Sequence, residues 1–485
     1  MVLDPDAAYR VLQAHDARFD GRLFIGVTST RIYCRPVCRV RLPQRRNCRF
    51  YANAASAEQA GFRPCLRCRP EQAPGLALVD SSTVLAQHAA RLLSQAAHDG
   101  QAVALPAVAA RLGVTDRHLR RIFLAAHGVT PINYLSTQRL LLAKALLTDT
   151  ALSVAAVALA AGFGSQRRFN AVFAQRYRLS PTGLRRAQRG THAMLPRDAL
   201  AGPSLRLAYR PPYDIDGVLA FFGARALPGA EAVDAPARTL RRTLALTHQG
   251  RHVTGWLALR FLAERHEVEA VVSPSLAAAL GAIAQRLRQG LDLDADPALI
   301  DGALQALPGA PGVRVVGGFD GFEIAVRVIL GQQVTVAAAR TLSRRLVEAL
   351  GEPLATPFAD LTRLFPTPQR IAAASADEIG RLGIVRQRVA ALQALARELE
   401  AGRIALHRGA PLAATLDALQ ALPGIGEWSA QLIAMRALAW PDAFPASDIG
   451  VMKALGTRDI RAVAEQSQAW RPWRAYAVMR LWQSS

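Results

Sequence analysis

The chain has 485 residues, of which 51% are hydrophobic, and a formal net charge of +22. This length predicts three or four domains with sizeable cores. Because no run of about 18 uncharged apolar residues occurs, we do not expect a membrane-spanning helix. The first residues, MVLDPDAAYR, lack the pattern of a secretory signal. We therefore expect a cytoplasmic protein with no membrane partner, whose thiols stay reduced.

The positive charge is concentrated in the first part of the chain. Residues 1–200 carry 28 Lys and Arg against 11 Asp and Glu, a net charge of +17, whereas residues 201–485 carry 31 against 26, a net charge of +5. Nearly all the cations are arginines, which bind phosphates with two parallel hydrogen bonds. A strongly basic N-terminal part predicts a nucleic-acid partner.

Residues 1–75 contain two close pairs of cysteines, in a strand-like stretch that ends in a Cys-Arg-Pro-x-Cys turn and in a short helix followed by Cys-x-x-Cys. This spacing predicts one Zn²⁺ held by four thiolates, in an environment rich in arginine. Two disulfides are disfavoured by the length of the chain and the missing secretory signal. The predicted ligands are Cys34, Cys38, Cys65 and Cys68, and Cys48 has no partner in the spacing.

The stretch from Gly26 to Pro70, with IYCRPVC and FYANAASAEQAGFRPCLRC, resembles the N-terminal domain of the bacterial Ada family. The resemblance implies a domain that removes a methyl group from methylphosphotriesters in DNA, with Cys34 both as zinc ligand and as methyl acceptor. A zinc-bound thiolate is a nucleophile at neutral pH, and a methylated phosphate has lost the charge that would repel it. The alternative is a zinc site that is purely structural.

Residues 80–190 contain two helix–turn–helix patterns, LPAVAARLGVTDRHLRRIFLAAHG and VAAVALAAGFGSQRRFNAVFAQRYRLSP. Two such patterns at this spacing resemble the AraC-type DNA-binding domain. Each second helix begins after a capping residue, Thr115 or Ser165, and offers polar side chains to a major groove. The predicted DNA-reading residues are Arg117, His118, Arg121, Gln166, Arg167 and Asn170. The alternative is a helical bundle with solvated arginines.

After a predicted linker at residues 191–202, residues 203–285 predict a small antiparallel α+β domain, and residues 286–485 are almost entirely helical. In LQALPGIGEWSAQLIAMRAL, a Leu-Pro-Gly-Ile-Gly turn joins two helices. Gly424 and Gly426 allow the backbone to approach a DNA phosphate closely, and carbonyls of the same turn could hold a monovalent cation. Asp448 follows in AFPASD, at the start of a helix that faces the hairpin.

This order of motifs, with FEIAVRVILGQQVTVAAA before it and PWRAYAVMRLW after it, resembles AlkA-type 3-methyladenine DNA glycosylase II. The resemblance implies that Asp448 stabilises the sugar cation or orients the attacking water. A capping aspartate is the alternative. Trp428 stands where related enzymes that cut the backbone carry a Lys, and Lys453 is out of place, so base release without lyase activity is expected.

The resemblance also bears on five positions around the predicted site. Trp428 and Trp482 could stack on a cationic alkylated base or could be core residues. Leu432 stands where AlkA relatives can carry Tyr, which leaves the range of bases open. Gln332 and Gln333 lie in a loop where the family places a wedge that fills the gap left by the extruded base.

The sequence therefore predicts a multidomain, mostly α protein: a small zinc α+β module, a double helix–turn–helix, a small antiparallel α+β domain and an all-α helix–hairpin–helix domain. The predicted function is repair of alkylated DNA combined with regulation of the adaptive response. The predicted partners are alkylated and promoter DNA and RNA polymerase, for a monomer at the bacterial nucleoid. The alternative is a transcriptional regulator whose C-terminal fold only binds DNA.

Overall fold

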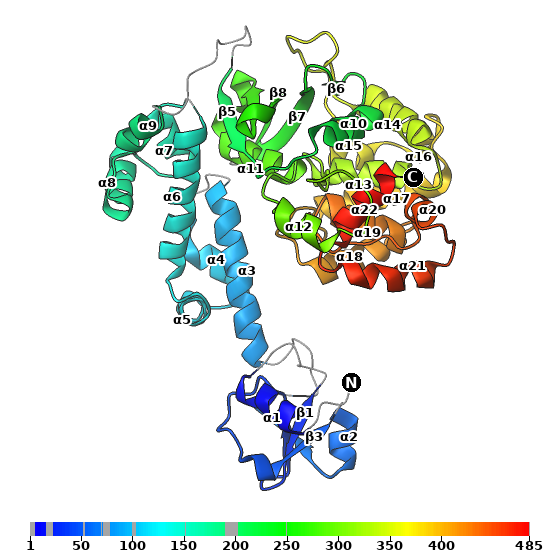
Figure 1. Cartoon of the computed structure of the whole chain (residues 1–485). Coiled ribbons are helices and arrows are strands. Elements are labelled where there is room, and N and C mark those ends of the chain that lie inside the picture. The colour runs from blue at the N-terminus through cyan, green and yellow to red at the C-terminus, as the bar shows by residue number, and fades with distance from the viewer. Residues whose placement is uncertain are drawn as a thin grey trace. The chain divides into compact units, whose positions relative to one another are not determined.

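A computed structural model describes residues 5–15, 23–51, 54–68, 70, 78–98, 103–150, 152–189, 202–248 and 250–484 (Figure 1). The chain forms two compact units, residues 1–96 with 102–138, and residues 97–101 with 139–485. The predicted linker at 191–202 lies outside the described residues except for Gly202. Among the helices that the structure describes, none is long and apolar enough to cross a membrane.

The first unit begins with a small sheet. Its elements are α1 (Pro5–Gln13), β1 (Phe24–Val27), β2 (Ile32–Cys34), a 3₁₀ turn (Arg45–Asn47), β3 (Cys48–Tyr51), α2 (Ala54–Gln59) and β4 (Arg63–Pro64). The strand order is β3-β1-β2-β4, and only the β2–β4 pair of this sheet is parallel. Cys48 packs with Ile25 and Leu12 in the apolar cluster between α1 and the sheet, which explains why it stands apart from the other cysteines.

Seven helices follow. They are α3 (Leu78–His98), α4 (Leu105–Arg111), α5 (Asp116–His127), α6 (Pro131–Asp149), α7 (Val154–Ala160), α8 (Gln166–Tyr177) and α9 (Pro181–Arg189). The side chains of Thr115 and Ser165 cap α5 and α8, each accepting a bond from a backbone N–H three residues later. The pairs α4–α5 and α7–α8 pack as the two predicted helix–turn–helix motifs. The boundary between the two units falls within α6.

A five-stranded antiparallel sheet opens the next part of the second unit. Its elements are β5 (Ser204–Ala208), α10 (Ile215–Arg225), β6 (Glu231–Asp234), β7 (Thr239–His248), β8 (Arg251–Leu262) and β9 (Glu267–Val272), followed by a 3₁₀ helix (Pro274–Ala279). The strand order is β5-β9-β8-β7-β6. Inward side chains such as Leu240, Leu244, Leu257 and Leu259 are buried, so the sheet turns one face to a shared core.

The remainder is helical. The helices are α11 (Leu280–Gly290), α12 (Pro297–Ala303), α13 (Gly321–Leu330), α14 (Val336–Leu350), α15 (Pro368–Ala373), α16 (Ala376–Gly380), α17 (Arg386–Glu400), α18 (Leu412–Gln420), α19 (Glu427–Arg436), α20 (Ile449–Ala454), α21 (Ile460–Gln466) and α22 (Arg474–Gln483). Helix α13 is buried along almost its whole length and packs against α14, α17 and α19. The predicted multidomain, mostly helical fold class is confirmed. The boundary predicted at residue 285 falls within α11.

A buried ion network joins the sheet to α13. Glu323 and Glu231 lie between the guanidinium groups of Arg242 and Arg327, with N–O distances of 2.5 to 2.9 Å. All four side chains are at most 15% exposed. Because two buried carboxylates match two buried guanidinium groups, the charges balance where the sheet domain meets the helices.

Candidate active site and metal centre

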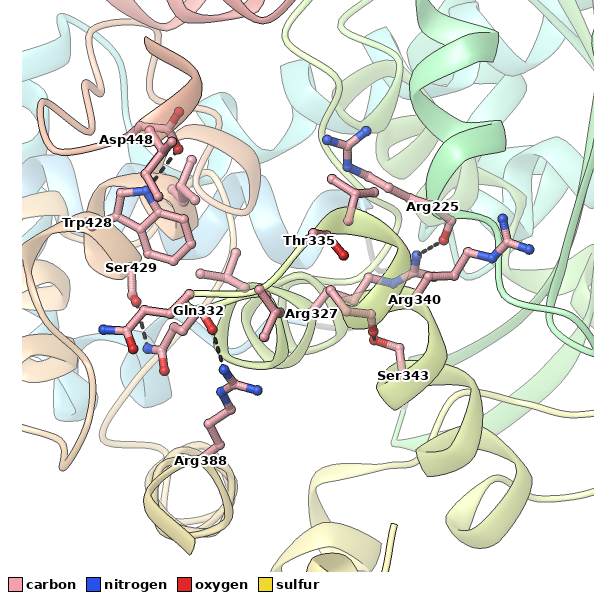
Figure 2. Close-up of a pocket in the computed structure, with 18 of the residues that line it drawn as sticks. Arg225, Arg327, Gln332, Thr335, Arg340, Ser343, Arg388, Trp428, Ser429 and Asp448 are labelled. Atoms are coloured by element: carbon pink, nitrogen blue, oxygen red, sulfur yellow. Dashed lines mark hydrogen bonds between the residues drawn. The ribbon is translucent and has the colours of Figure 1, made fainter. Parts of the chain in front are cut away.

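A pocket of about 1140 Å³ opens between α10, the α13–α14 loop, the α18–α19 hairpin, and helices α20 and α22 (Figure 2). These elements are far apart in the sequence, and all belong to the second unit. Most of the C-terminal residues that the sequence singled out line this pocket, namely Gln332, Gln333, Gly424, Gly426, Trp428, Leu432, Asp448 and Trp482. Lys453 is not among the lining residues.

Asp448 is the carboxylate of the pocket. It is 8% exposed and stands at the N-cap of α20, where Oδ1 accepts a bond of 3.1 Å from the backbone N–H of Val451. Its side chain thus caps a helix and also lines the pocket, so the two interpretations open at the sequence level are compatible. A cap that also accepts hydrogen bonds from distant side chains is held in one orientation.

Both candidate tryptophans donate to this carboxylate. The indole N–H of Trp428 lies 2.9 Å from Oδ2 (Figure 2). The indole N–H of Trp482 lies 2.8 Å from Oδ1. Each indole is half-buried and lines the pocket. The sequence predicted only that the faces of these indoles could stack on a base. The structure adds that their edges orient Asp448.

The hairpin between α18 and α19 presents backbone to the pocket. Gly424 adopts φ +75°, a conformation that favours glycine, and lies against Gln387 and Ala391 of α17. A side chain at Gly426 would meet open space, so the backbone at the start of α19 is accessible. An exposed helix N-terminus of this kind suits a phosphate.

The two glutamines of the α13–α14 loop differ in environment. The side-chain amide of Gln332 donates to the backbone carbonyl of Gly424 at 2.8 Å and to Oγ of Ser429 at 2.9 Å. The backbone carbonyl of Gln332 accepts a bond from Arg388. Gln332 therefore braces the loop against the hairpin. Gln333 is exposed and adopts φ +53°. Of the two, Gln333 is the side chain available to enter a DNA helix.

Sequence reasoning missed the wall that α10 contributes. The Phe221 ring stacks on Trp482, with centroids 6.4 Å apart and an interplanar angle of 18°. The guanidinium groups of Arg225 and Arg436 lie 3.8 and 5.0 Å from the centroid of the same ring. No local motif marks Phe221 and Arg225, because α10 belongs to the sheet domain and reaches the pocket only through tertiary packing.

The four predicted zinc ligands come together in the first unit. Their sulfur atoms all lie within 4.8 Å of one another, and the residues are between 1 and 7% exposed. Zn–S bonds of about 2.3 Å place the sulfurs of a tetrahedral site about 3.8 Å apart, so the cluster fits Zn²⁺. The ligands Cys34, Cys38, Cys65 and Cys68 lie at the end of β2, in the following turn and in the turn after β4.

The four cysteine sulfurs differ in the hydrogen bonds that they accept from backbone N–H groups. The N–H of Arg35 donates to Sγ of Cys68 at 3.5 Å. Hydrogen bonds from Cys34 and Cys68 hold the pKa of the Cys38 thiol below its usual value, with a further contribution from the N–H of Val40. The pKa of Cys34 is raised, chiefly by its hydrogen bonds to Cys38 and Cys68 and by burial, and no backbone N–H of the described residues donates to its sulfur. A thiolate without such a donor keeps more of its charge on sulfur.

The predicted DNA-reading side chains lie on α5 and α8. Arg117, Arg121, Gln166 and Arg167 are exposed, and His118 and Asn170 are half-buried. Arg121 donates to Nδ1 of His118 at 3.1 Å, so these two side chains form one unit on α5. Oδ1 of Asn170 is buried without a partner among the described residues. Each helix thus carries polar groups at its N-terminal end.

Four family models match successive parts of the chain. They are the metal binding domain of Ada (residues 7–71), a helix-turn-helix domain (108–187), the AlkA N-terminal domain (204–320) and the HhH-GPD superfamily base excision DNA repair protein (326–468). Together they cover the zinc cage, the sheet, and most of the helix–turn–helix motifs and of the pocket, from which Trp482 is left out.

Three relatives are similar over different lengths. A probable bifunctional transcriptional activator/DNA repair enzyme AlkA of Mycobacterium tuberculosis is 38% identical over 99% of this chain and 96% of its own length. DNA-3-methyladenine glycosylase 2 of Escherichia coli is 33% identical over 57% of this chain and 95% of its own. The bifunctional transcriptional activator/DNA repair enzyme Ada of Escherichia coli is 42% identical over 27% of this chain and 34% of its own.

Proposed function

The chain belongs to the family of bifunctional transcriptional activator/DNA repair enzymes that join Ada-type zinc and helix–turn–helix domains to an AlkA-type glycosylase, and we propose that Asp448 is the residue with which it releases alkylated bases. It is a zinc-binding, DNA-binding repair protein and transcriptional regulator with a DNA glycosylase domain. The observation that carries the proposal is the carboxylate of Asp448, held in the pocket by Trp428 and Trp482.

The proposed reaction is hydrolysis of the N-glycosidic bond. A base must leave the stack before its glycosidic bond is accessible, and the pocket volume admits an extruded nucleotide. As the bond to the base breaks, the sugar becomes cationic, and a carboxylate fixed beside it stabilises that charge or orients the attacking water. With Lys453 outside the pocket, a Schiff base with the sugar lacks its amine there, so the reaction ends at base release.

The proposed substrate class is 3-methyladenine and related alkylated purines. Two indoles and Phe221 give the pocket aromatic faces, and electron-poor alkylated bases are attracted to such faces. The name of the Escherichia coli glycosylase that matches this half of the chain supports the same class. Gln333 is proposed to fill the gap left by the extruded base. Gly424 and Gly426 are proposed to hold a DNA phosphate, with a monovalent cation at the same turn.

The zinc centre is proposed to accept methyl groups from DNA phosphotriesters through Cys34. Zinc keeps four thiols deprotonated in a buried cage, and Zn²⁺ with four thiolates carries a net charge of −2. Cys38 and Cys68 each share charge with a backbone N–H, whereas Cys34 does so with none among the described residues. Attack by sulfur on the methyl carbon breaks its bond to the phosphate oxygen, leaving a phosphodiester and S-methylcysteine.

The helix–turn–helix motifs are proposed to bind promoter DNA through α5 and α8 and to bring RNA polymerase to it. We propose that the protein works as a monomer at the nucleoid of the bacterial cytoplasm, because each chain supplies two reading helices. Methylation of Cys34 would make the zinc cage less negative and ease its approach to DNA phosphates.

The decisive experiment follows labelled methyl groups from alkylated DNA. The zinc-loaded protein, Cys34→Ala and Asp448→Asn are each incubated with DNA that carries radiolabelled methyl groups, and free base is separated from protein-bound label. We expect free methylated base with the wild type and Cys34→Ala but not with Asp448→Asn. We expect protein-bound label with the wild type and Asp448→Asn but not with Cys34→Ala. DNA binding without either signal would leave a regulator whose C-terminal domain only binds DNA.

A further inference from the structure

Arg225 is the cation that faces the proposed catalytic carboxylate across the pocket. It ends α10, and its guanidinium group extends into the pocket toward Trp428 and Asp448 (Figure 2). Its charge is close enough to that of Asp448 for the two to interact, although they form no ion pair within 4.0 Å in the described part of the chain. The Arg225 guanidinium and the Asp448 carboxylate thus do not contact each other across the pocket.

Most hydrogen-bonding capacity of Arg225 is unused among the described residues. Its Nη1 donates to the carbonyl of Phe221 at 3.3 Å, and its guanidinium lies 3.8 Å from the centroid of the Phe221 ring. A guanidinium group has five N–H donors, and one of those of Arg225 is used by the Phe221 carbonyl, so four have no acceptor among the described residues. Arg327 differs, since it lies in the ion network with Glu231 and Glu323.

The guanidinium is held in place by its surroundings. Phe221, below it, is itself packed on Trp482, which donates to Asp448. The carbonyl of Arg225 accepts a bond of 3.0 Å from Arg327, which anchors the end of α10 to α13. Burial, with a smaller contribution from Arg327, lowers the pKa of Arg225 to about 10, so the side chain is still protonated at neutral pH. A base between Trp428 and Phe221 therefore meets a fixed positive charge.

We propose that Arg225 is a specificity-determining residue that lets this pocket release uncharged damaged bases, by donating a hydrogen bond to an acceptor on the base as the glycosidic bond breaks. The inference rests on the proposed glycosylase function of Asp448 and adds to it a residue that acts on the base as it leaves. Arg225 would stabilise the leaving base, whereas Asp448 would stabilise the sugar.

The charge balance of the reaction separates two kinds of base. A cationic base, such as 7-methylguanine in DNA, takes the bonding electron pair and leaves neutral, so a nearby positive charge gives it no help. An uncharged base, such as hypoxanthine, takes the same pair and leaves as an anion, which receives a proton while the hydroxyl of water joins C1′. A guanidinium group that donates to the oxygen or a ring nitrogen of that anion stabilises it.

The test compares two 6-oxopurines that differ in charge. Single-turnover release of hypoxanthine and of 7-methylguanine from matched duplexes is measured for the wild type, Arg225→Met, Arg225→Gln and Arg340→Met at saturating enzyme. For Arg225→Met we expect hypoxanthine release to fall roughly 100-fold, the scale of one lost charge-stabilising donor. We expect 7-methylguanine release to change by less than about threefold, because its leaving group is neutral.

The other variants separate the charge from the donor and from general DNA binding. Arg225→Gln keeps an N–H donor without the charge, so hypoxanthine release should recover in part. Arg340 is an exposed arginine on the rim of the same pocket, and Arg340→Met should change both reactions by the same factor. Thermal unfolding of each variant shows whether the loss of the Phe221 contact affects folding.

Three outcomes oppose one proposal or the other. An equal fall of both reactions in Arg225→Met would overturn the specificity role and leave Arg225 as a packing partner of Phe221. Release of 7-methylguanine but never of hypoxanthine by the wild type would overturn it as well, while the proposed function of Asp448 stands. If the wild type releases neither base and Asp448→Asn is no different, the proposed function itself fails.

Discussion

The indole N–H of Trp482 donates to Oδ1 of Asp448 over 2.8 Å, although 34 residues separate the two in the chain. Together with the 2.9 Å bond from Trp428 to Oδ2, it leaves each carboxylate oxygen with one indole donor. The rotation of the carboxylate is then set by two rings that also line the pocket. Orientation of the catalytic group and the shape of the pocket are therefore coupled.

Replacing each indole with a ring that lacks the N–H tests this coupling. In Trp428→Phe and Trp482→Phe we expect base release in single turnovers to slow by about tenfold each, the effect of one hydrogen bond of about 1.4 kcal/mol. DNA affinity should stay near that of the wild type, because an aromatic face remains. Trp440→Phe is the control, since Trp440 does not line the pocket. A loss of affinity with an unchanged rate would contradict the orienting role.

Replacement with Ala should reduce the stability of the protein at Gln332 but not at Gln333. Gln332→Ala leaves the Gly424 carbonyl and the Ser429 hydroxyl without their donor, so we expect a loss of about 1–3 kcal/mol in the free energy of unfolding and weaker DNA binding. Gln333→Ala should leave the unfolding free energy within about 0.5 kcal/mol, because Gln333 is exposed.

Base extrusion distinguishes the two glutamines in a second way. With a fluorescent base beside the lesion, Gln333→Ala should reduce the signal of the extruded state if Gln333 fills the gap. Denaturant unfolding and fluorescence titration measure the two effects separately. Equal destabilisation by both variants would argue against a bracing role for Gln332.

The buried ion network should be sensitive to the loss of one carboxylate charge. Glu323→Gln leaves Arg242 and Arg327 with Glu231 as their remaining carboxylate in the network, so we expect a cost of about 3–5 kcal/mol in the free energy of unfolding. Glu348→Gln is the matched control, because Glu348 forms an exposed pair with Arg344 and should cost at most about 0.5 kcal/mol. Thermal and urea unfolding of both variants measure the difference.

The same network predicts how stability depends on pH. Burial acts to raise the pKa of Glu323, but the guanidinium groups of Arg242 and Arg327 hold this pKa below its usual value. A lowered carboxyl pKa contributes stability above the pKa of the unfolded chain and loses it as the pH falls through the folded pKa. The wild type should therefore lose stability on acidification more steeply than Glu323→Gln. If the free energy of unfolding falls equally steeply at low pH in the two proteins, other carboxylates determine the acid sensitivity.

Removal of zinc should affect the first unit alone. A strong chelator should unfold the zinc module, because structural zinc sites supply folding free energy to small domains. Base release should persist, because the pocket is built from residues of the second unit. Cys68→Ala should reduce the zinc content below one ion per chain, whereas Cys48→Ala, which alters an apolar cluster, should retain it. Metal analysis and circular dichroism of both variants check this.

The sequence predicted those parts of the sites whose residues stand close together in the chain. Four cysteines in two short pairs can meet with few alternatives, and the structure brings them within 4.8 Å. The hairpin and Asp448 were found for a similar reason, since a turn, a helix and a short connection place them in one pocket.

Contacts between distant elements were not predictable in this way. Phe221 and Arg225 carry no local signal, because nothing in the sequence of α10 shows that it meets Trp482 of α22 and Arg327 of α13. The role of Gln332 was also hidden, because its two hydrogen-bond acceptors lie 92 and 97 residues further along the chain. The sequence also did not show that the indole N–H groups of Trp428 and Trp482 donate to Asp448.

The three donors to Asp448 come from α19, α20 and α22, so the carboxylate is completed only when all three helices are docked. A partly folded chain that has formed its helices but not packed them would carry the same residues without their alignment. Glycosylase activity is thus expected to appear late in folding and together with the last tertiary contacts. For an enzyme that cuts bases from a genome, such cooperativity is a safeguard, because a partly folded copy would lack the aligned carboxylate.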